Sequence, residues 1–157
     1  MKGHRSGAAA GLLQWGVAST PFERPLRVLV VDDESYNLDT FRRVFRRQFA
    51  MDFATSAQEA LELLNRGDYD VLVTDHAMPG LTGVQLLERV RNDYPHLGRV
   101  MVTAHAELAE VRESLENGVS TAVVMKPWRK EELLHWIRHA AKMRPTRPTT
   151  AEVEPKT

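Results

Sequence analysis

Four short apolar runs constrain the fold of this chain more than any other feature of its sequence. They are rich in valine, do not alternate with polar residues, and occupy positions 26–31, 71–73, 100–102 and 122–125. A strand that is covered on both faces has such a continuous apolar sequence, as in parallel sheets. The runs therefore predict buried parallel strands, with a weaker apolar segment at 51–54 as an edge strand.

Segments with the apolar spacing of amphipathic helices separate these runs. They cover positions 38–45, 57–64, 84–90, 108–115 and 133–140. Strands that alternate with amphipathic helices indicate right-handed crossovers and a parallel sheet covered on both sides. We therefore predict a three-layer α/β domain of about five strand-helix repeats.

Local signals mark the ends and faces of these helices. Two capping boxes, in which a hydroxyl residue is followed three positions later by Glu or Gln, are predicted at Ser56 with Glu59 and at Thr82 with Gln85. The fourth helix is predicted to present one apolar stripe, formed by Leu108, Val111 and Leu115.

Charge, cysteine content and hydropathy narrow the class of protein. The 21 basic and 21 acidic side chains cancel, so no overall field indicates binding to nucleic acid. The chain has no cysteine, which excludes disulfides and thiolate metal sites and fits a reducing compartment. No apolar run approaches the roughly 20 residues that span a bilayer. We therefore expect a cytoplasmic protein that binds neither nucleic acid nor membrane.

The two ends of the chain differ in composition from the part between them. Residues 143–157 are rich in proline and threonine and almost free of apolar side chains, which is typical of disordered segments. We predict a disordered N-terminal tail at 1–25, one domain at 26–142 and a disordered C-terminal tail at 143–157.

Polar side chains follow the predicted strands at the points where the strands end. In chain order they are Asp32, Asp33, Asp75, Thr103 and Lys126. Each residue alone would be an ordinary turn former, cap or solvated charge. The carboxyl ends of parallel strands meet at one edge of the sheet, where ligands bind in open α/β folds. The joint pattern therefore predicts that these five side chains converge.

The chemistry of such a cluster favours phosphoryl transfer. Three neighbouring carboxylates repel one another unless a cation offsets their charge, and Mg²⁺ prefers oxygen ligands of this kind. A nearby Lys and hydroxyl suit a reaction that depends on positioning and charge neutralisation. A carboxylate can itself be the nucleophile, which would form an aspartyl phosphate.

With these residues in place, the chain resembles the receiver domains of bacterial two-component systems over residues 26–141. Four motifs carry the resemblance, at positions 28–34 (VLVVDDE), 74–83 (TDHAMPGLTG), 102–104 (VTA) and 126–128 (KPW). The resemblance implies a flavodoxin-like, doubly wound sheet of five parallel strands in the order 2-1-3-4-5, with five helices.

The resemblance also implies a role for each residue of the cluster. Asp75 would be the phosphoacceptor, Lys126 would pair with a phosphoryl oxygen, and Thr103 would hydrogen-bond the phosphoryl group. The implied Mg²⁺ ligands are Asp33, Asp75, the backbone carbonyl of Ala77, and Asp32 chiefly through metal-bound water. Pro127 implies a cis peptide bond after Lys126.

The implied partners are a histidine kinase or histidine phosphotransfer protein and a downstream protein effector. A homodimer surface formed by the fourth helix, the fifth strand and the fifth helix would also follow. The chain would catalyse only its own phosphorylation and dephosphorylation, and so would not be an enzyme in the usual sense.

The resemblance also bears on how the signal is read out and on how long the phosphoryl group lasts. Val123 occupies a position where family members usually carry Tyr or Phe, so the usual coupling between Thr103 and an aromatic ring does not follow here. Ala77 cannot orient a hydrolytic water, and we expect a phosphoryl group that is not unusually short-lived.

Two other functions remain open from the sequence. One is a docking or dimerisation module of receiver fold whose phosphorylation is incidental, which Val123 favours and the complete acidic set opposes. The other is an aspartate-dependent phosphatase of the haloacid dehalogenase type, whose Asp-x-Asp signature is missing because Asp75 is followed by His76 and Ala77.

Overall fold

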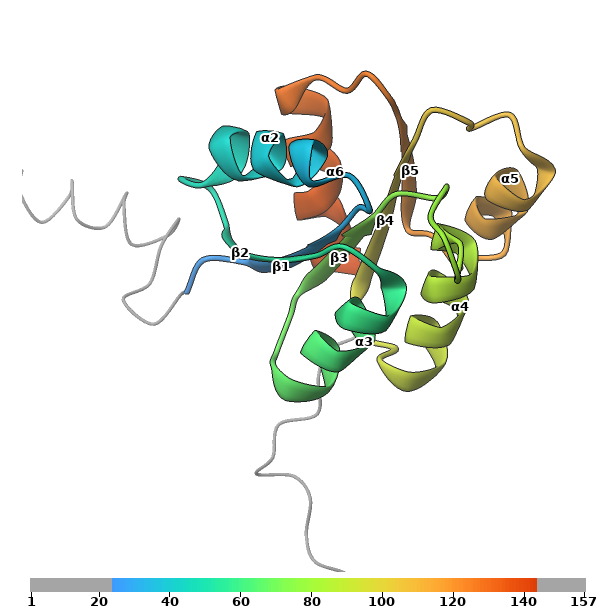
Figure 1. Cartoon of the computed structure of the whole chain (residues 1–157), viewed down its shortest axis with the longest axis horizontal. Helices are drawn as coiled ribbons and strands as arrows, with labels where there is room; N and C mark the ends of the chain where they lie inside the picture. The colour runs from blue at the N-terminus through green and yellow to red at the C-terminus, as the bar shows by residue number, and fades with distance from the viewer. Residues whose placement is uncertain (1–23, 144–157) are drawn as a thin grey trace, which may run out of the picture.

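The computed structural model describes residues 24–143, which contain a parallel sheet between two layers of helices (Figure 1). The five strands of this part of the chain lie in the order β2-β1-β3-β4-β5, which confirms the predicted doubly wound topology. The strands are β1 (Arg27–Val31), β2 (Ala50–Ala54), β3 (Val71–Thr74), β4 (Gly98–Thr103) and β5 (Ala122–Met125). The weakly apolar segment at 51–54 lies in the edge strand β2, as predicted.

The helices form two layers on opposite faces of the sheet. They are α2 (Ser35–Phe45), α3 (Ala57–Arg66), α4 (Gly83–Asp93), α5 (Ala109–Glu116) and α6 (Lys130–Met143). Helices α2 and α6 cover one face, and α3, α4 and α5 cover the other (Figure 1).

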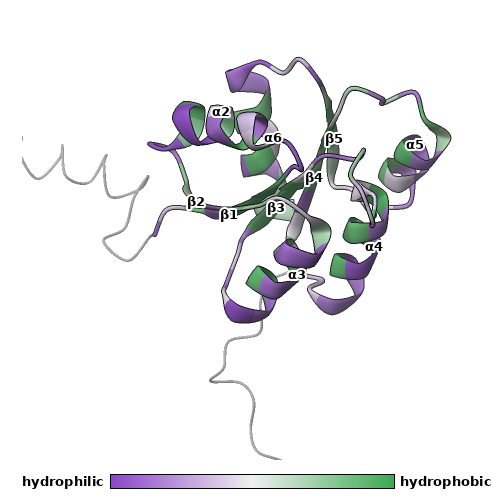
Figure 2. Ribbon diagram, viewed as in Figure 1, coloured by the Kyte–Doolittle hydropathy of each residue, from purple (hydrophilic) through white to green (hydrophobic). Residues whose placement is uncertain are grey.

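The two hydrophobic cores explain why the central strands do not alternate in sequence. In β1, Val28 and Val30 pack with α2 and α6, whereas Leu29 and Val31 pack with the opposite layer. All four side chains are at most 4% exposed. The apolar colouring of the sheet and of the inner sides of the helices follows this arrangement (Figure 2). Burial on both faces therefore removes any need for polar residues within the strand.

The strand register brings the ends of β1, β3, β4 and β5 to the same edge of the sheet. Val31 pairs with Thr74, and Thr103 pairs with Met125. The ladder continues one step further, because the Asp75 N–H donates to the Val31 carbonyl at 3.0 Å and the Lys126 N–H donates to the Thr103 carbonyl at 2.9 Å. The loops that follow these strands therefore begin side by side.

Of the two predicted capping boxes, the one at α4 is complete and the one at α3 is only partly formed. The capping box at the start of α4 is complete, with the Thr82 and Gln85 side chains each bonding the other's backbone N–H. At α3, the Ser56 hydroxyl accepts a bond from the Glu59 N–H, but the Glu59 carboxylate bonds the N–H and hydroxyl of Thr55 instead. The second box is therefore half formed.

Helix α5 is buried less deeply than its apolar stripe predicts. Val111 and Ser114 are its buried residues, whereas Leu108 before its first turn is 38% exposed and Leu115 is 47% exposed. The helix lies at the end of the sheet beside α4, and its main contact with the sheet is to the edge strand β5 (Figure 1). Of the three residues of the predicted apolar stripe, only Val111 is therefore buried.

The predicted tails fall almost wholly outside the described residues. Arg24, which the prediction assigns to the N-terminal tail, forms an ion pair of 2.8 Å with the buried Asp70.

Among residues 24–143, none of the helices combines the length and apolar content that crossing a membrane would need.

Candidate functional site

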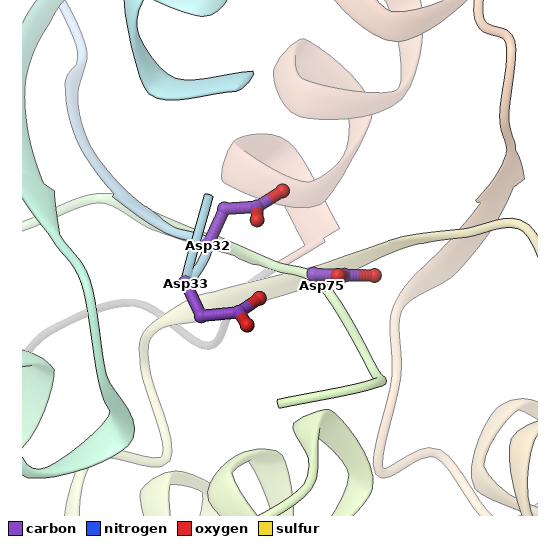
Figure 3. Close-up of side chains that lie close together, drawn as sticks. All are labelled: Asp32, Asp33 and Asp75. Carbon is purple, nitrogen blue, oxygen red and sulfur yellow. The ribbon is translucent and has the colours of Figure 1, made fainter. Parts of the chain in front are cut away.

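Three carboxylates meet where β1 and β3 end. Asp32 and Asp33 follow β1 directly, and Asp75 follows β3. Each of the three offers a carboxylate oxygen, and these oxygens lie within 4.8 Å of one another. Figure 3 shows the three side chains gathered at this edge of the sheet. The predicted acidic cluster is therefore present, although its members come from loops that lie far apart in the sequence.

The two members of the acidic pair are held differently. Asp32 is 6% exposed, and its oxygens accept hydrogen bonds from the Glu34 N–H at 2.9 Å and from the Asn37 amide at 3.1 Å. Asp33 is exposed, and its side chain makes no hydrogen bond or ion pair with residues 24–143. Asp32 is thus a fixed structural carboxylate, and Asp33 is a carboxylate free to take a ligand.

Asp75 sits deeper in the site, with its side chain 13% exposed. Its Oδ1 accepts a hydrogen bond of 2.8 Å from the His76 N–H. Within the described residues, Oδ2 accepts no hydrogen bond. Burial raises the pKa of the Asp75 carboxyl and the charge of Asp32 raises it further, against the opposing effects of Lys126 and the His76 N–H. Oδ2 is therefore the oxygen of Asp75 that remains available for chemistry.

Lys126 enters the cluster from the end of β5. Its ammonium nitrogen lies 3.3 Å from Oδ2 of Asp32 and 3.5 Å from Oδ1 of Asp75. The peptide bond to Pro127 is cis, as the sequence predicts. The lysine thus offsets part of the negative charge of two carboxylates at once.

Thr103 and Ala77 complete the set of predicted residues. Thr103 ends β4 and is fully buried, and its hydroxyl accepts a hydrogen bond of 3.0 Å from the His105 N–H. Ala77 is exposed in the loop after β3, and its carbonyl accepts no hydrogen bond from a described residue. No hydrogen bond therefore prevents that carbonyl oxygen from binding a ligand.

A largely apolar cavity of about 630 Å³ opens beside the cluster, between α2 and the residues after β5. Asp32, Asp75 and Lys126 line one part of it. Trp128 lines another part and packs its ring 5.6 Å from the ring of Phe45. An anionic group at Asp75 would therefore have a polar edge and an apolar wall beside it.

Sequence reasoning left His76 and Asn37 without a role in this region. Asn37 holds the Asp32 carboxylate, and His76 is 3% exposed with both ring nitrogens engaged. The one sequence signal that could have drawn attention to position 76 was a histidine directly after Asp75 at the end of an apolar strand. Val123, at the position where an aromatic side chain was expected, is partly buried against the core formed with α3, α4 and α5.

The part of the chain that holds this site is similar to proteins that are already known. A family model described as the response regulator receiver domain matches residues 28–138. The chemotaxis protein CheY of Pseudomonas aeruginosa is 38% identical over 116 residues, which cover 69% of this chain and 90% of CheY.

The chain is also similar to part of a longer protein and to solved structures. The hydrogenase transcriptional regulatory protein HoxA of Cupriavidus necator is 32% identical over 118 residues, and the chain spans only 24% of its length. The response regulator TrrA of Thermotoga maritima, solved in complex with Mg²⁺ and BeF, has a TM-score of 0.65 and 25% identity. That comparison covers 73% of this chain and 98% of the TrrA chain.

Proposed function

Because this chain belongs to the response-regulator receiver family, we propose that it accepts a phosphoryl group onto Asp75 and signals through altered protein-protein interaction. The observation that carries the proposal is the convergence of Asp75 with Asp32, Asp33 and Lys126. The free Oδ2 of Asp75 and the ammonium group of Lys126 are the nucleophile and the cation that such a transfer requires.

The transfer is a displacement at phosphorus. An oxygen of the Asp75 carboxylate attacks the phosphorus atom of a phosphohistidine donor, and the bond between phosphorus and the imidazole nitrogen breaks with its electron pair on that nitrogen. Lys126 pairs with an oxygen of the transferred group, and the hydroxyl of Thr103 hydrogen-bonds another once that side chain turns toward it. These groups hold in place the charge that develops in the transition state.

The donor set fits Mg²⁺. Three carboxylates within 4.8 Å of one another supply hard oxygen ligands, and Mg²⁺ is commonly held by one or two carboxylates with phosphate oxygens. Asp33, Asp75 and the Ala77 carbonyl would hold the ion directly, with Asp32 contributing through bound water. The ion would neutralise charge on the phosphoryl oxygens and on the carboxylates. The complex of TrrA with Mg²⁺ and BeF supports this assignment.

The partners proposed are a histidine kinase or histidine phosphotransfer protein as donor and a protein effector as recipient of the signal. The domain at 26–142 would act in the cytoplasm, and α5, β5 and α6 would form the surface for a homodimer. In this role the chain catalyses only its own phosphorylation and dephosphorylation.

A second candidate function is a docking module of receiver fold that binds its partner whether or not Asp75 is phosphorylated. Val123 favours this alternative, because its side chain has no polar group or ring that could report the state of Thr103. The two candidates differ in one measurable property. Partner binding would depend on BeF₃⁻ for a switch and would be independent of BeF₃⁻ for a constitutive module.

The proposal is tested by incubating the protein with Mg²⁺ and either acetyl phosphate or BeF₃⁻. We expect a covalent phosphoryl adduct by mass spectrometry and a bound fluoride signal by ¹⁹F NMR. Asp75→Asn should abolish both, whereas Asp93→Asn, a matched change at an exposed aspartate of α4, should change neither. A wild-type protein that gives neither signal would falsify the proposal.

A further inference from the structure

We infer that the hydrogen bond between His76 and Glu110 transmits the state of Asp75 to helix α5. The inference rests on the proposed phosphorylation of Asp75 and adds the route by which the domain would report it. His76 is a positioning residue here, because it acts through the elements that it joins and not on the phosphoryl group. Four hydrogen bonds of His76 and the shallow burial of α5 support the inference.

The side chain of His76 joins two helices. The ring is almost fully buried, and its Nδ1 accepts a hydrogen bond of 3.4 Å from the Val84 N–H in the first turn of α4. Because Nδ1 is an acceptor, the ring proton lies on Nε2. Nε2 therefore donates to Oε1 of Glu110, at 2.8 Å, in the first turn of α5.

The backbone of His76 is joined to the phosphoacceptor. Its N–H donates to Oδ1 of Asp75 at 2.8 Å, and its carbonyl accepts a bond of 2.9 Å from the Gly83 N–H. A hydrogen bond to an ionised carboxylate is roughly twice as strong as one between neutral groups. When Asp75 becomes an acyl phosphate, its carboxylate charge is lost, so this bond weakens and residue 76 is the first to respond.

Helix α5 can shift in response to a movement of residue 76 with little loss of packing free energy. Of its eight residues only Val111 and Ser114 are buried, and its N-cap residue Leu108 makes no side-chain capping bond. Segments with few buried apolar contacts are the ones that move most easily in folded proteins. The side chain of Glu110 is 58% exposed, so its bond to His76 joins the buried loop to the outer surface of the domain.

The test compares two readouts in the same 157-residue chain. Occupancy of the Asp75 site is measured by the ¹⁹F NMR signal of bound BeF₃⁻ in the presence of Mg²⁺. The response of α5 is measured as the change in amide hydrogen exchange over residues 109–116 when BeF₃⁻ is added. Because each variant is compared with itself, a static effect on the stability of α5 cancels.

The variants are chosen at the exposed end of the hydrogen bond, so that folding is preserved. Glu110→Ala removes the acceptor, and Glu110→Gln keeps an acceptor oxygen without the charge. Glu113→Ala is the matched control on the same helix, at an exposed residue whose side chain makes no hydrogen bond or ion pair with described residues.

We expect Glu110→Ala to bind BeF₃⁻ as the wild type does and to lose most of the exchange response of α5. Glu110→Gln should restore the response, and Glu113→Ala should retain it. A bound BeF₃⁻ signal with an unchanged α5 response in Glu110→Ala would overturn the coupling and leave the proposed function standing. Absence of bound BeF₃⁻ in the wild type would overturn both.

Discussion

The ammonium nitrogen of Lys126 lies 3.5 Å from Oδ1 of Asp75. The two side chains are 26% and 13% exposed, so water screens this pair only in part. The same nitrogen also contacts Asp32 at 3.3 Å, and a phosphoryl group on Asp75 would compete for it. Lys126 therefore provides a cation that is already in position before the reaction.

Removing this cation should weaken binding of a phosphoryl analogue. A hydrogen bond to a charged group contributes about 1.5–3 kcal/mol, so we expect Lys126→Ala to lower BeF₃⁻ affinity by about tenfold or more. Titration followed by ¹⁹F NMR measures the change. Lys130→Ala, at an exposed lysine at the start of α6, should leave the affinity as it is, and equal losses in both variants would contradict the assignment.

The free carboxylate of Asp33 should contribute directly to Mg²⁺ affinity. Loss of even an indirect partner of a metal site lowers affinity by about 10–100-fold, so we expect Asp33→Asn to lower it at least about tenfold. Isothermal titration calorimetry with Mg²⁺ alone measures the effect. Asp39→Asn, at an exposed aspartate of α2, serves as control; an unchanged affinity in Asp33→Asn would exclude Asp33 as a ligand.

The raised pKa of Asp75 predicts how the stability of the metal-free protein depends on pH. The folded state binds a proton at Asp75 more tightly than the unfolded chain does. The stabilisation from this group is therefore present below the unfolded pKa of about 3.9 and is lost as pH rises through the higher folded pKa.

Asp75→Asn removes this charge and should be more stable than the wild type near neutral pH. The difference should disappear in acid, where the wild-type carboxyl is protonated in both states. Urea midpoints measured across pH in EDTA test this, with Asp93→Asn as the control. A variant that is less stable than the wild type at neutral pH would show that the Lys126 pair outweighs the burial of the charge.

The buried hydroxyl of Thr103 should be needed for the loop that follows β4. Thr103→Val keeps the shape of the side chain but leaves the His105 N–H without its acceptor, which we expect to cost about 1–2 kcal/mol of unfolding free energy. Thr103→Ser keeps the hydroxyl and should lose less. Urea denaturation compares the two, and the reverse order would show that packing of the methyl group matters more than the hydrogen bond.

Gly83 should be required for the close approach of α4 to the loop that follows β3. A Cβ at this position would meet the Asp75 carbonyl oxygen and lie 2.8 Å from the His76 Cα, both backbone atoms. We expect Gly83→Ala to lose about 1–3 kcal/mol of stability through overpacking and also to weaken BeF₃⁻ binding.

Gly80→Ala is the contrasting variant. Its φ of 79° disfavours a side chain, but nothing lies within 4 Å of the added Cβ. It should cost about 1 kcal/mol and leave BeF₃⁻ binding unchanged. Equal effects of the two variants on BeF₃⁻ binding would contradict a specific role for the close approach at Gly83.

Much of the fold and of the acidic cluster could be predicted from the sequence, since both depend on local or periodic signals. The valine-rich runs mark strands because burial on both faces excludes polar residues along a whole segment. The alternation of strands and helices then restricts the connections to right-handed crossovers. Given that topology, Asp32, Asp75 and Lys126 must follow strands that end at one edge.

Other features were decided only by the tertiary structure, because they depend on how far one element lies from another. Spacing places Leu115 on the apolar stripe of its helix, but the position of α5 at the end of the sheet leaves that side chain 47% exposed. The contact of His76 with Glu110 joins the loop after β3 to the first turn of α5, and no periodicity relates these residues. The sequence by itself thus determined which residues reach the edge of the sheet, and packing of the helices decided which of them touch.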